Sequence, residues 1–162
     1  FGYNRIGFNI LNSLKRLKEK YLVIDFNPDT ISNLKKFRIP AVYGDVYDYD
    51  FLDEIPVSEA KIIISTIPDP ETNLLLIDYI KKLNKKAVVI VRAHQIDDAF
   101  YLYKKGVDYV LTPHFLGGEY VAKMIANFRT DSKKYKNERD KHIKMLSQMI
   151  SKGHKHPDVE RN

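Results

Sequence analysis

The first residues of the chain, FGYNRIG, have the spacing of a phosphate-binding turn. Gly2, Asn4 and Gly7 occupy the three glycine positions of the pattern G-x-G-x-x-G, with asparagine in the middle. In such a turn, backbone N–H groups and the positive end of the following helix point at a phosphate. Gly2 would supply the tight turn, and Gly7 would let the helix lie close to the sheet. The spacing predicts a nucleotide site if a strand precedes it and a helix follows.

The asparagine at the middle position has two consequences. Asparagine tolerates left-handed backbone angles better than any residue except glycine, so we expect the turn to survive. Its side chain fills the space through which a pyrophosphate would approach the backbone, so it either displaces the ligand or hydrogen-bonds to it. Asn4 therefore favours a mononucleotide relative to a standard site.

A carboxylate and an arginine accompany the turn. Asp25 ends the next expected strand, 18 residues after Gly7, where an acidic residue holds ribose hydroxyls in dinucleotide-binding folds. The alternative is that Asp25 only caps the turn into Pro28. Arg5 lies just after the turn, where it could reach a phosphate or remain a solvated helix residue.

Other spacings resemble catalytic or metal-binding patterns but lack the context. Tyr101 and Lys105 form Y-x-x-x-K, as in short-chain dehydrogenases, without a serine at the expected distance upstream. His94 follows a strand, where a general base could lie, but we expect no carboxylate partner for it. His154 and His156 have no third metal ligand in view. We therefore expect no catalytic residue, no enzyme activity and no metal site.

Short apolar runs rich in β-branched residues alternate with longer amphipathic stretches. This pattern predicts an α/β protein with a Rossmann-like, doubly wound parallel sheet of about six strands. The first strand is largely truncated, so we expect upstream residues in the parent protein. The expected strands are 1–2, 21–25, 40–45, 61–66, 87–93 and 109–113. The expected helices are 4–20, 28–37, 50–54, 70–83, 97–105 and one from about 117. The first of them has Ile6, Ile10, Leu14 and Leu17 on one face. Asn27 caps helix 28–37, and Asp69 caps helix 70–83.

Composition and charge limit the class of protein. The 162 residues are 44% hydrophobic and 30% charged and include no cysteine. No apolar run approaches the roughly 20 residues of a membrane span and no signal peptide is evident, so we interpret the chain as intracellular. Of the formal charge of +6, residues 131–162 hold +4, from nine Lys/Arg and five Asp/Glu. We expect a nucleotide-binding domain over 1–130 and a basic helical extension with a frayed end over 131–162, with an apolar stripe of Ile143, Leu146, Met149 and Ile150.

Several segments together resemble one family. GYNRIG, VIDFNP, VYGDVYD, IIIST followed by IPDPETN, VVIVRA and GVDYVLTP are similar to the nucleotide-binding lobe called RCK-N or TrkA-N, over about residues 1–127. That family regulates potassium channels, Trk and Ktr uptake systems and Kef-type cation:proton antiporters. The resemblance implies a cytoplasmic regulatory domain at the cytosolic face of the membrane, controlling potassium or cation transport.

The resemblance also implies that the ligand is bound by the loops after successive strands. The residues it implies are Gly2, Asn4, Arg5, Ile6 and Gly7 at the phosphates, Asp25, Phe26 and Asn27 at the ribose, Gly44, Asp45 and Val46 at the adenine, Thr66, Ile67 and Pro68 over the ribose and phosphates, and Arg92 facing the ligand. Asp45 could instead cap the helix expected near Asp50. The cofactor implied is NAD(H), AMP or another adenine nucleotide, and Asn4 moves the expectation toward AMP.

Partners follow from the same resemblance. Family members pair through the last strand and the following helix, which implies a homodimer through residues 110–124 and a membrane transport domain in the parent protein. His114, at the start of that helix, would be a cap or a dimer contact. We expect no nucleic-acid partner. Two alternatives stay open: a fragment of an NAD(H)-dependent oxidoreductase, and a nucleic-acid contact through the basic tail.

Overall fold

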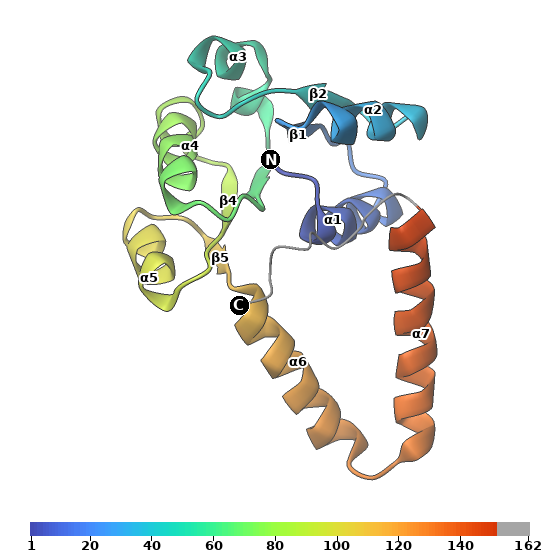
Figure 1. Ribbon diagram of the computed structural model, residues 1–162. Coiled ribbons are helices and arrows are strands. Elements are labelled where there is room, and N and C mark those ends of the chain that lie inside the picture. The colour runs from blue at the N-terminus through green and yellow to red at the C-terminus, as the bar shows by residue number, and fades with distance from the viewer. Residues whose placement is uncertain (152–162) are drawn as a thin grey trace. The chain divides into compact units, whose positions relative to one another are not determined.

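A computed structural model describes residues 1–151 of the chain (Figure 1). The chain divides into two compact units, Phe1–Leu116 and Gly117–Asn162. The predicted boundary near residue 130 stays a prediction, and the predicted frayed end lies outside the described residues. Within residues 1–151, no helix has the length and apolar character needed to cross a membrane.

Strands and helices alternate through the first unit, as predicted. In chain order they are α1 (Arg5–Arg16), β1 (Val23–Asp25), α2 (Pro28–Lys36), β2 (Ala41–Tyr43), α3 (Tyr49–Glu54), the 3-10 turn η1 (Val57–Glu59), β3 (Ile62–Ser65), α4 (Pro70–Leu83), β4 (Val88–Arg92), α5 (Ile96–Lys104), β5 (Tyr109–Leu111) and the beginning of α6 (Pro113–Phe128). The predicted α/β class is confirmed, and α6 begins earlier than expected because Pro113 fits the first helical turn.

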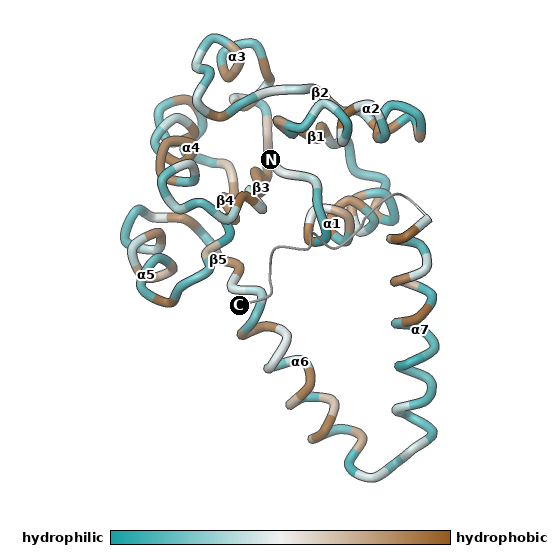
Figure 2. The backbone as a smooth tube through the Cα atoms, in the orientation of Figure 1, coloured by the Kyte–Doolittle hydropathy of each residue, from teal (hydrophilic) through white to brown (hydrophobic). Residues whose placement is uncertain are grey.

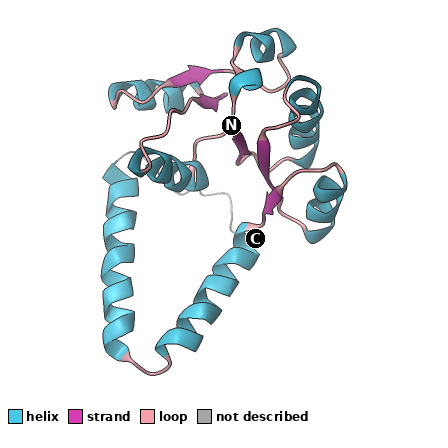
Figure 3. Ribbon diagram, turned by 180° about the vertical axis from the view of Figure 1, so that it is seen from behind, coloured by secondary structure: helices cyan, strands magenta, loops and turns pink. Residues whose placement is uncertain are grey.

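All strand pairs are parallel. β1 pairs with β2, and β3, β4 and β5 form a second set in that order. The two sets appear as separate groups of magenta arrows on either side of the N-terminus (Figure 3).

Phe1 and Gly2 connect the two sets of strands. The Phe1 nitrogen donates to the Ile64 carbonyl at 2.7 Å, and the Thr66 N–H donates to the Phe1 carbonyl at 2.9 Å. On the other side, the Gly2 N–H donates to the Ile24 carbonyl at 2.8 Å. The two residues therefore hold the place of a central strand, as the sequence predicted, between β1 and β3.

The main core lies between β3–β5 and helices α4 and α5, where Leu76, Ile77, Ile80 and Leu102 are fully buried. Figure 2 shows the hydrophobic residues of these strands in brown.

One side of α1 is buried against the rest of the first unit. Gly7, Phe8 and Leu11 are buried, whereas Leu17 is 69% exposed. Two apolar arcs run along this helix, and the arc that contains Gly7 can approach the backbone of the preceding turn most closely. Of the predicted apolar face, Ile6, Ile10 and Leu14 are half-buried.

Two predicted helix caps are confirmed. The Asn27 side chain accepts hydrogen bonds from the N–H groups of Asp29 and Thr30 and precedes Pro28 at the first helical position of α2. Asp69 accepts from the Thr72 N–H at 2.7 Å and from the Thr72 hydroxyl at 2.6 Å. Both bonds lower the pKa of the Asp69 carboxyl, and the bond from the Thr72 hydroxyl has the larger effect. Both caps satisfy N–H groups that the helix leaves unpaired.

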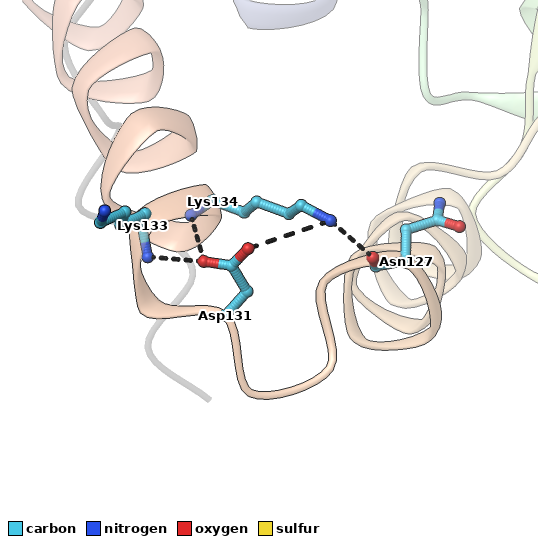
Figure 4. Close-up of polar contacts among 4 residues, drawn as sticks. All are labelled: Asn127, Asp131, Lys133 and Lys134. Atoms are coloured by element: carbon cyan, nitrogen blue, oxygen red, sulfur yellow. Dashed lines mark hydrogen bonds and ion pairs between the residues drawn. The ribbon is translucent and has the colours of Figure 1, made fainter.

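The second unit contains most of α6 and the helix α7 (Ser132–Ser151), which confirms a helix in the basic extension. Asp131 directly precedes α7 and caps its first turn: its carboxylate accepts hydrogen bonds from the N–H groups of Lys133 and Lys134 at 3.0 and 3.3 Å (Figure 4). The Lys134 ammonium reaches back to the Asn127 carbonyl at 3.5 Å. The Tyr120 hydroxyl of α6 donates to the Glu138 carboxylate of α7. Ile143, Leu146 and Ile150 of the predicted stripe are exposed.

Candidate functional site

The two glycines of the phosphate turn are required by geometry. Gly2 has a φ of +78°, and a Cβ there would lie 2.8 Å from the Thr66 hydroxyl oxygen. A Cβ on Gly7 would lie 2.7 Å from the Gly2 carbonyl oxygen. The N-terminus of α1 therefore lies directly against the turn, which is the arrangement that presents helix N–H groups to an anion.

Asn4 does not adopt the left-handed conformation that asparagine tolerates. Its φ and ψ are −126° and −149°, and it is the N-cap residue of α1. N-cap residues adopt non-helical, extended angles, so the turn does not need the special tolerance of asparagine. Instead, the Asn4 side-chain oxygen accepts a hydrogen bond from the Arg5 N–H at 2.9 Å. One of the N–H groups that would face a phosphate is thereby already occupied.

Asp25 fastens the phosphate turn to the end of β1. The side chain is only 8% exposed, and its two oxygens accept from the Tyr3 N–H at 2.6 Å and the Asn27 N–H at 2.9 Å. Asp25 therefore caps the turn into Pro28. This role does not exclude ribose binding, because each carboxylate oxygen can accept a further hydrogen bond.

The bond from Tyr3 was not predicted. A backbone donor carries no residue-type signal, so only the folded turn reveals it. The Tyr3 side chain is buried, and this burial, with a smaller contribution from Tyr21, raises the pKa of its hydroxyl to about 12.

The loop after β2 approaches the same place. The Gly44 N–H donates to the Asp25 carbonyl at 3.2 Å, and the Phe51 ring covers the Gly44 Cα so closely that any side chain there would displace it. Asp45 accepts from the Tyr47 N–H at 3.0 Å. The helix cap that Asp45 could have provided comes from Asp48 instead, so that alternative for Asp45 is wrong.

A buried asparagine connects the loops after β3 and β4. The Asn73 side chain is fully buried, and its amide donates to the Ile67 and Arg92 carbonyls, both at 2.9 Å. Its side-chain oxygen has no hydrogen-bond partner within residues 1–151. Because buried acceptors are normally satisfied, we expect ordered water at this oxygen. Position in the first turn of α4 was the only sequence signal for this role.

The predicted site residues fall into two groups: those that contact one another directly or through Asn73, and those that do not. Hydrogen bonds or close packing connect Gly2 with Gly7 and Thr66, Asp25 with Asn27 and Gly44, and Ile67 with Arg92 through Asn73. Val46 is buried in the core. Phe26, Asp45 and Pro68 are exposed in the loops after their strands, while Arg5 and Ile6 are half-buried in the first turn of α1. The carboxyl ends of parallel strands are where doubly wound sheets bind ligands.

Sequence comparison identifies the family. The family model described as the TrkA-N domain matches residues 1–113. The Escherichia coli protein KefC, a glutathione-regulated potassium-efflux system protein, is 33% identical over 107 residues, which is 66% of this chain. The chain spans only 17% of the length of that relative.

Solved structures share the fold. The TrkA-N domain of the inner membrane protein YbaL from Escherichia coli has a TM-score of 0.71 at 21% identity, covering 76% of this chain and 92% of that one. The Kef CTD of Shewanella denitrificans in its AMP-bound form has a TM-score of 0.67 at 18% identity, covering 93% and 91%. The GsuK channel bound to NAD has a TM-score of 0.62 at 22% identity, covering 70% and 20%, and GsuK was also solved with ADP.

Proposed function

Since the chain belongs to the TrkA-N domain family, we propose that it is a regulatory domain that senses an adenine nucleotide. The observation that carries the proposal is the phosphate turn: Gly2 at positive φ, Gly7 against the Gly2 carbonyl, and the Asp25 carboxylate bonded to the Tyr3 N–H. The N-terminus of α1 supplies the phosphate contacts, and Asp25 accepts a ribose hydroxyl. That relatives of the same fold were solved with AMP, ADP and NAD supports this ligand class.

The domain acts within a potassium or cation transport protein, of the Kef antiporter or potassium-channel type. The name of KefC and the GsuK channel support this assignment. Nucleotide binding shifts the population of two arrangements of paired domains, and the favoured arrangement biases a membrane transport domain. The domain itself carries out no catalytic step, and it lies at the cytosolic face of the membrane.

Isothermal titration calorimetry with AMP, ADP, ATP, NAD and NADH tests the proposed ligand class. Binding of at least one of them is the expected result. Absence of heat with all five, confirmed by an unchanged melting temperature, would remove the nucleotide-sensing role and leave the fold assignment intact.

An Asn4→Gly variant should bind NAD more tightly relative to AMP, by about tenfold, the equivalent of one net hydrogen bond. Glycine frees the Arg5 N–H, which the Asn4 side chain occupies at 2.9 Å, and opens the space for a pyrophosphate. Replacing an asparagine N-cap by glycine costs only a few tenths of a kcal/mol, so the fold should persist. Calorimetry of both ligands measures the ratio. Asn4→Ser, which keeps a capping oxygen, is the control, and an unchanged ratio in Asn4→Gly would refute the selectivity role.

Pairing is proposed to occur between two copies of this chain through β5 and α6, residues 110–124. No residue of α6 is buried, and Phe115, Tyr120, Val121 and Ile125 are each more than half exposed. An apolar surface of this kind is typical of an interaction site. Sedimentation equilibrium should show a dimer that Val121→Glu dissociates, whereas Lys104→Glu, a charge change at an exposed residue of α5 outside residues 110–124, should leave it intact. Monomers alone at high concentration would contradict the pairing.

A further inference from the structure

Two histidines from distant parts of the sequence meet beside the last two strands. His94 follows the end of β4, and His114 lies in the first turn of α6, just after β5. β4 and β5 are parallel neighbours with Arg92 opposite Leu111, and the Ala93 N–H donates to the Leu111 carbonyl at 3.0 Å. This pairing holds the two segments together, and the imidazole centroids lie 5.1 Å apart with an interplanar angle of 81°.

Both imidazoles are chemically available. Each histidine is exposed, and within residues 1–151 neither side chain takes part in a hydrogen bond or an ion pair. Histidines that serve only as caps or as packing residues normally direct a ring nitrogen to a backbone or side-chain group. Within residues 1–151, no polar group occupies a nitrogen of either ring.

The separation of the rings fits a shared metal ion. With a metal–nitrogen bond of about 2.1 Å and a ring centre roughly 1.1 Å beyond the nitrogen, two imidazoles on one tetrahedral ion have centroids about 5 Å apart. The observed 5.1 Å agrees. Edge-to-face aromatic pairs can have similar separations. A metal-binding measurement therefore distinguishes a shared metal site from a simple ring contact.

We propose that His94 and His114 form a two-histidine chelate for a borderline divalent transition-metal ion such as Zn²⁺, Ni²⁺ or Cu²⁺. Imidazole nitrogen selects these ions over Mg²⁺ and Ca²⁺, which prefer oxygen ligands. No group of three or more His, Cys, Asp or Glu side chains in the described part of the chain could hold a metal, so water completes the coordination. The ion ties the start of α6 to the end of β4, a connection that the sequence-based expectation of no metal site did not include.

The test uses the full chain with the other three histidines replaced, His142→Asn, His154→Asn and His156→Asn, because these could bind metal on their own. In this background, without nucleotide, titration with NiCl₂ or ZnCl₂ should show one ion per chain and a rise in melting temperature that EDTA reverses. Adding His94→Asn or His114→Asn should each weaken binding by about tenfold or more, equivalent to losing one of two ligands. MgCl₂ at the same concentration should have no such effect.

A second measurement detects metal binding without relying on the melting temperature. Cu²⁺ should broaden the NMR signals of Gln95 and Phe115, which directly follow the two histidines, and this broadening should vanish in either single variant. Metal binding that survives both substitutions, a stoichiometry of one ion per two chains, or no binding at millimolar metal would each overturn the chelate. Because nucleotide is absent throughout, these outcomes are distinct from failure of the proposed function.

Discussion

A Gly7→Ala substitution is expected to lower the free energy of unfolding by about 1–3 kcal/mol, although alanine favours helix over glycine by about 1 kcal/mol. A Cβ on Gly7 would lie 2.7 Å from the Gly2 carbonyl oxygen and 3.6 Å from the Tyr3 ring. That carbonyl cannot move aside easily, because the Gly2 N–H is bonded to the Ile24 carbonyl and the Thr66 hydroxyl donates to the same Gly2 oxygen. The helix has to shift instead.

The shift of α1 should also weaken nucleotide binding, by about tenfold, because the N–H groups at its first turn move away from the proposed phosphate position. Urea denaturation and calorimetry measure the two effects. Gly117→Ala is the matched control, since a Cβ at that helical position meets no atom within 4 Å and should be neutral or stabilising. A Gly7→Ala protein as stable as Gly117→Ala, with unchanged affinity, would contradict the close-approach role.

The local signals of the sequence predicted most of the fold. Asn27 and Asp69 each precede a proline at the first helical position. The starts of α2 and α4 could therefore be predicted from residues that lie next to each other in the sequence. The face of α1 could not be predicted in this way. Phe8, next to Gly7, is fully buried where α1 packs on the turn, whereas Leu17 follows the end of the helix and is exposed.

The candidate site was predictable only where residue type determines the contact. Positive φ at Gly2 follows from the motif, but the extended angles of Asn4 do not, because asparagine is compatible with both a left-handed turn and an N-cap. The contact of His94 with His114 depends on the neighbouring ends of β4 and β5. Sequence separation hides such contacts, since the register of two strands is a property of the whole sheet.

An Asp25→Asn variant is expected to lose about 2–4 kcal/mol of stability, the effect of breaking charge-assisted hydrogen bonds to buried backbone donors. The carboxylate accepts from the Tyr3 N–H at 2.6 Å and the Asn27 N–H at 2.9 Å. An amide has one acceptor oxygen, so its NH₂ group would face one of these two donors. Asp78→Asn, at an exposed position of α4, removes the same charge and should change stability little. Thermal denaturation of the two variants gives the comparison.

Nucleotide affinity of Asp25→Asn, measured at a temperature where circular dichroism shows it folded, separates the two roles of this carboxylate. Affinity should fall at least about tenfold, because the proposed charged acceptor for a ribose hydroxyl is replaced by a neutral amide and the proposed phosphate-binding turn is loosened. Unchanged affinity in the folded variant would restrict Asp25 to fastening the turn and exclude it from the ligand. Lost affinity with full stability would instead mean that the bonds to Tyr3 and Asn27 contribute little. We expect Asp25→Asn to lose both stability and nucleotide affinity, because one buried carboxylate holds the turn together and is proposed to bind the ribose.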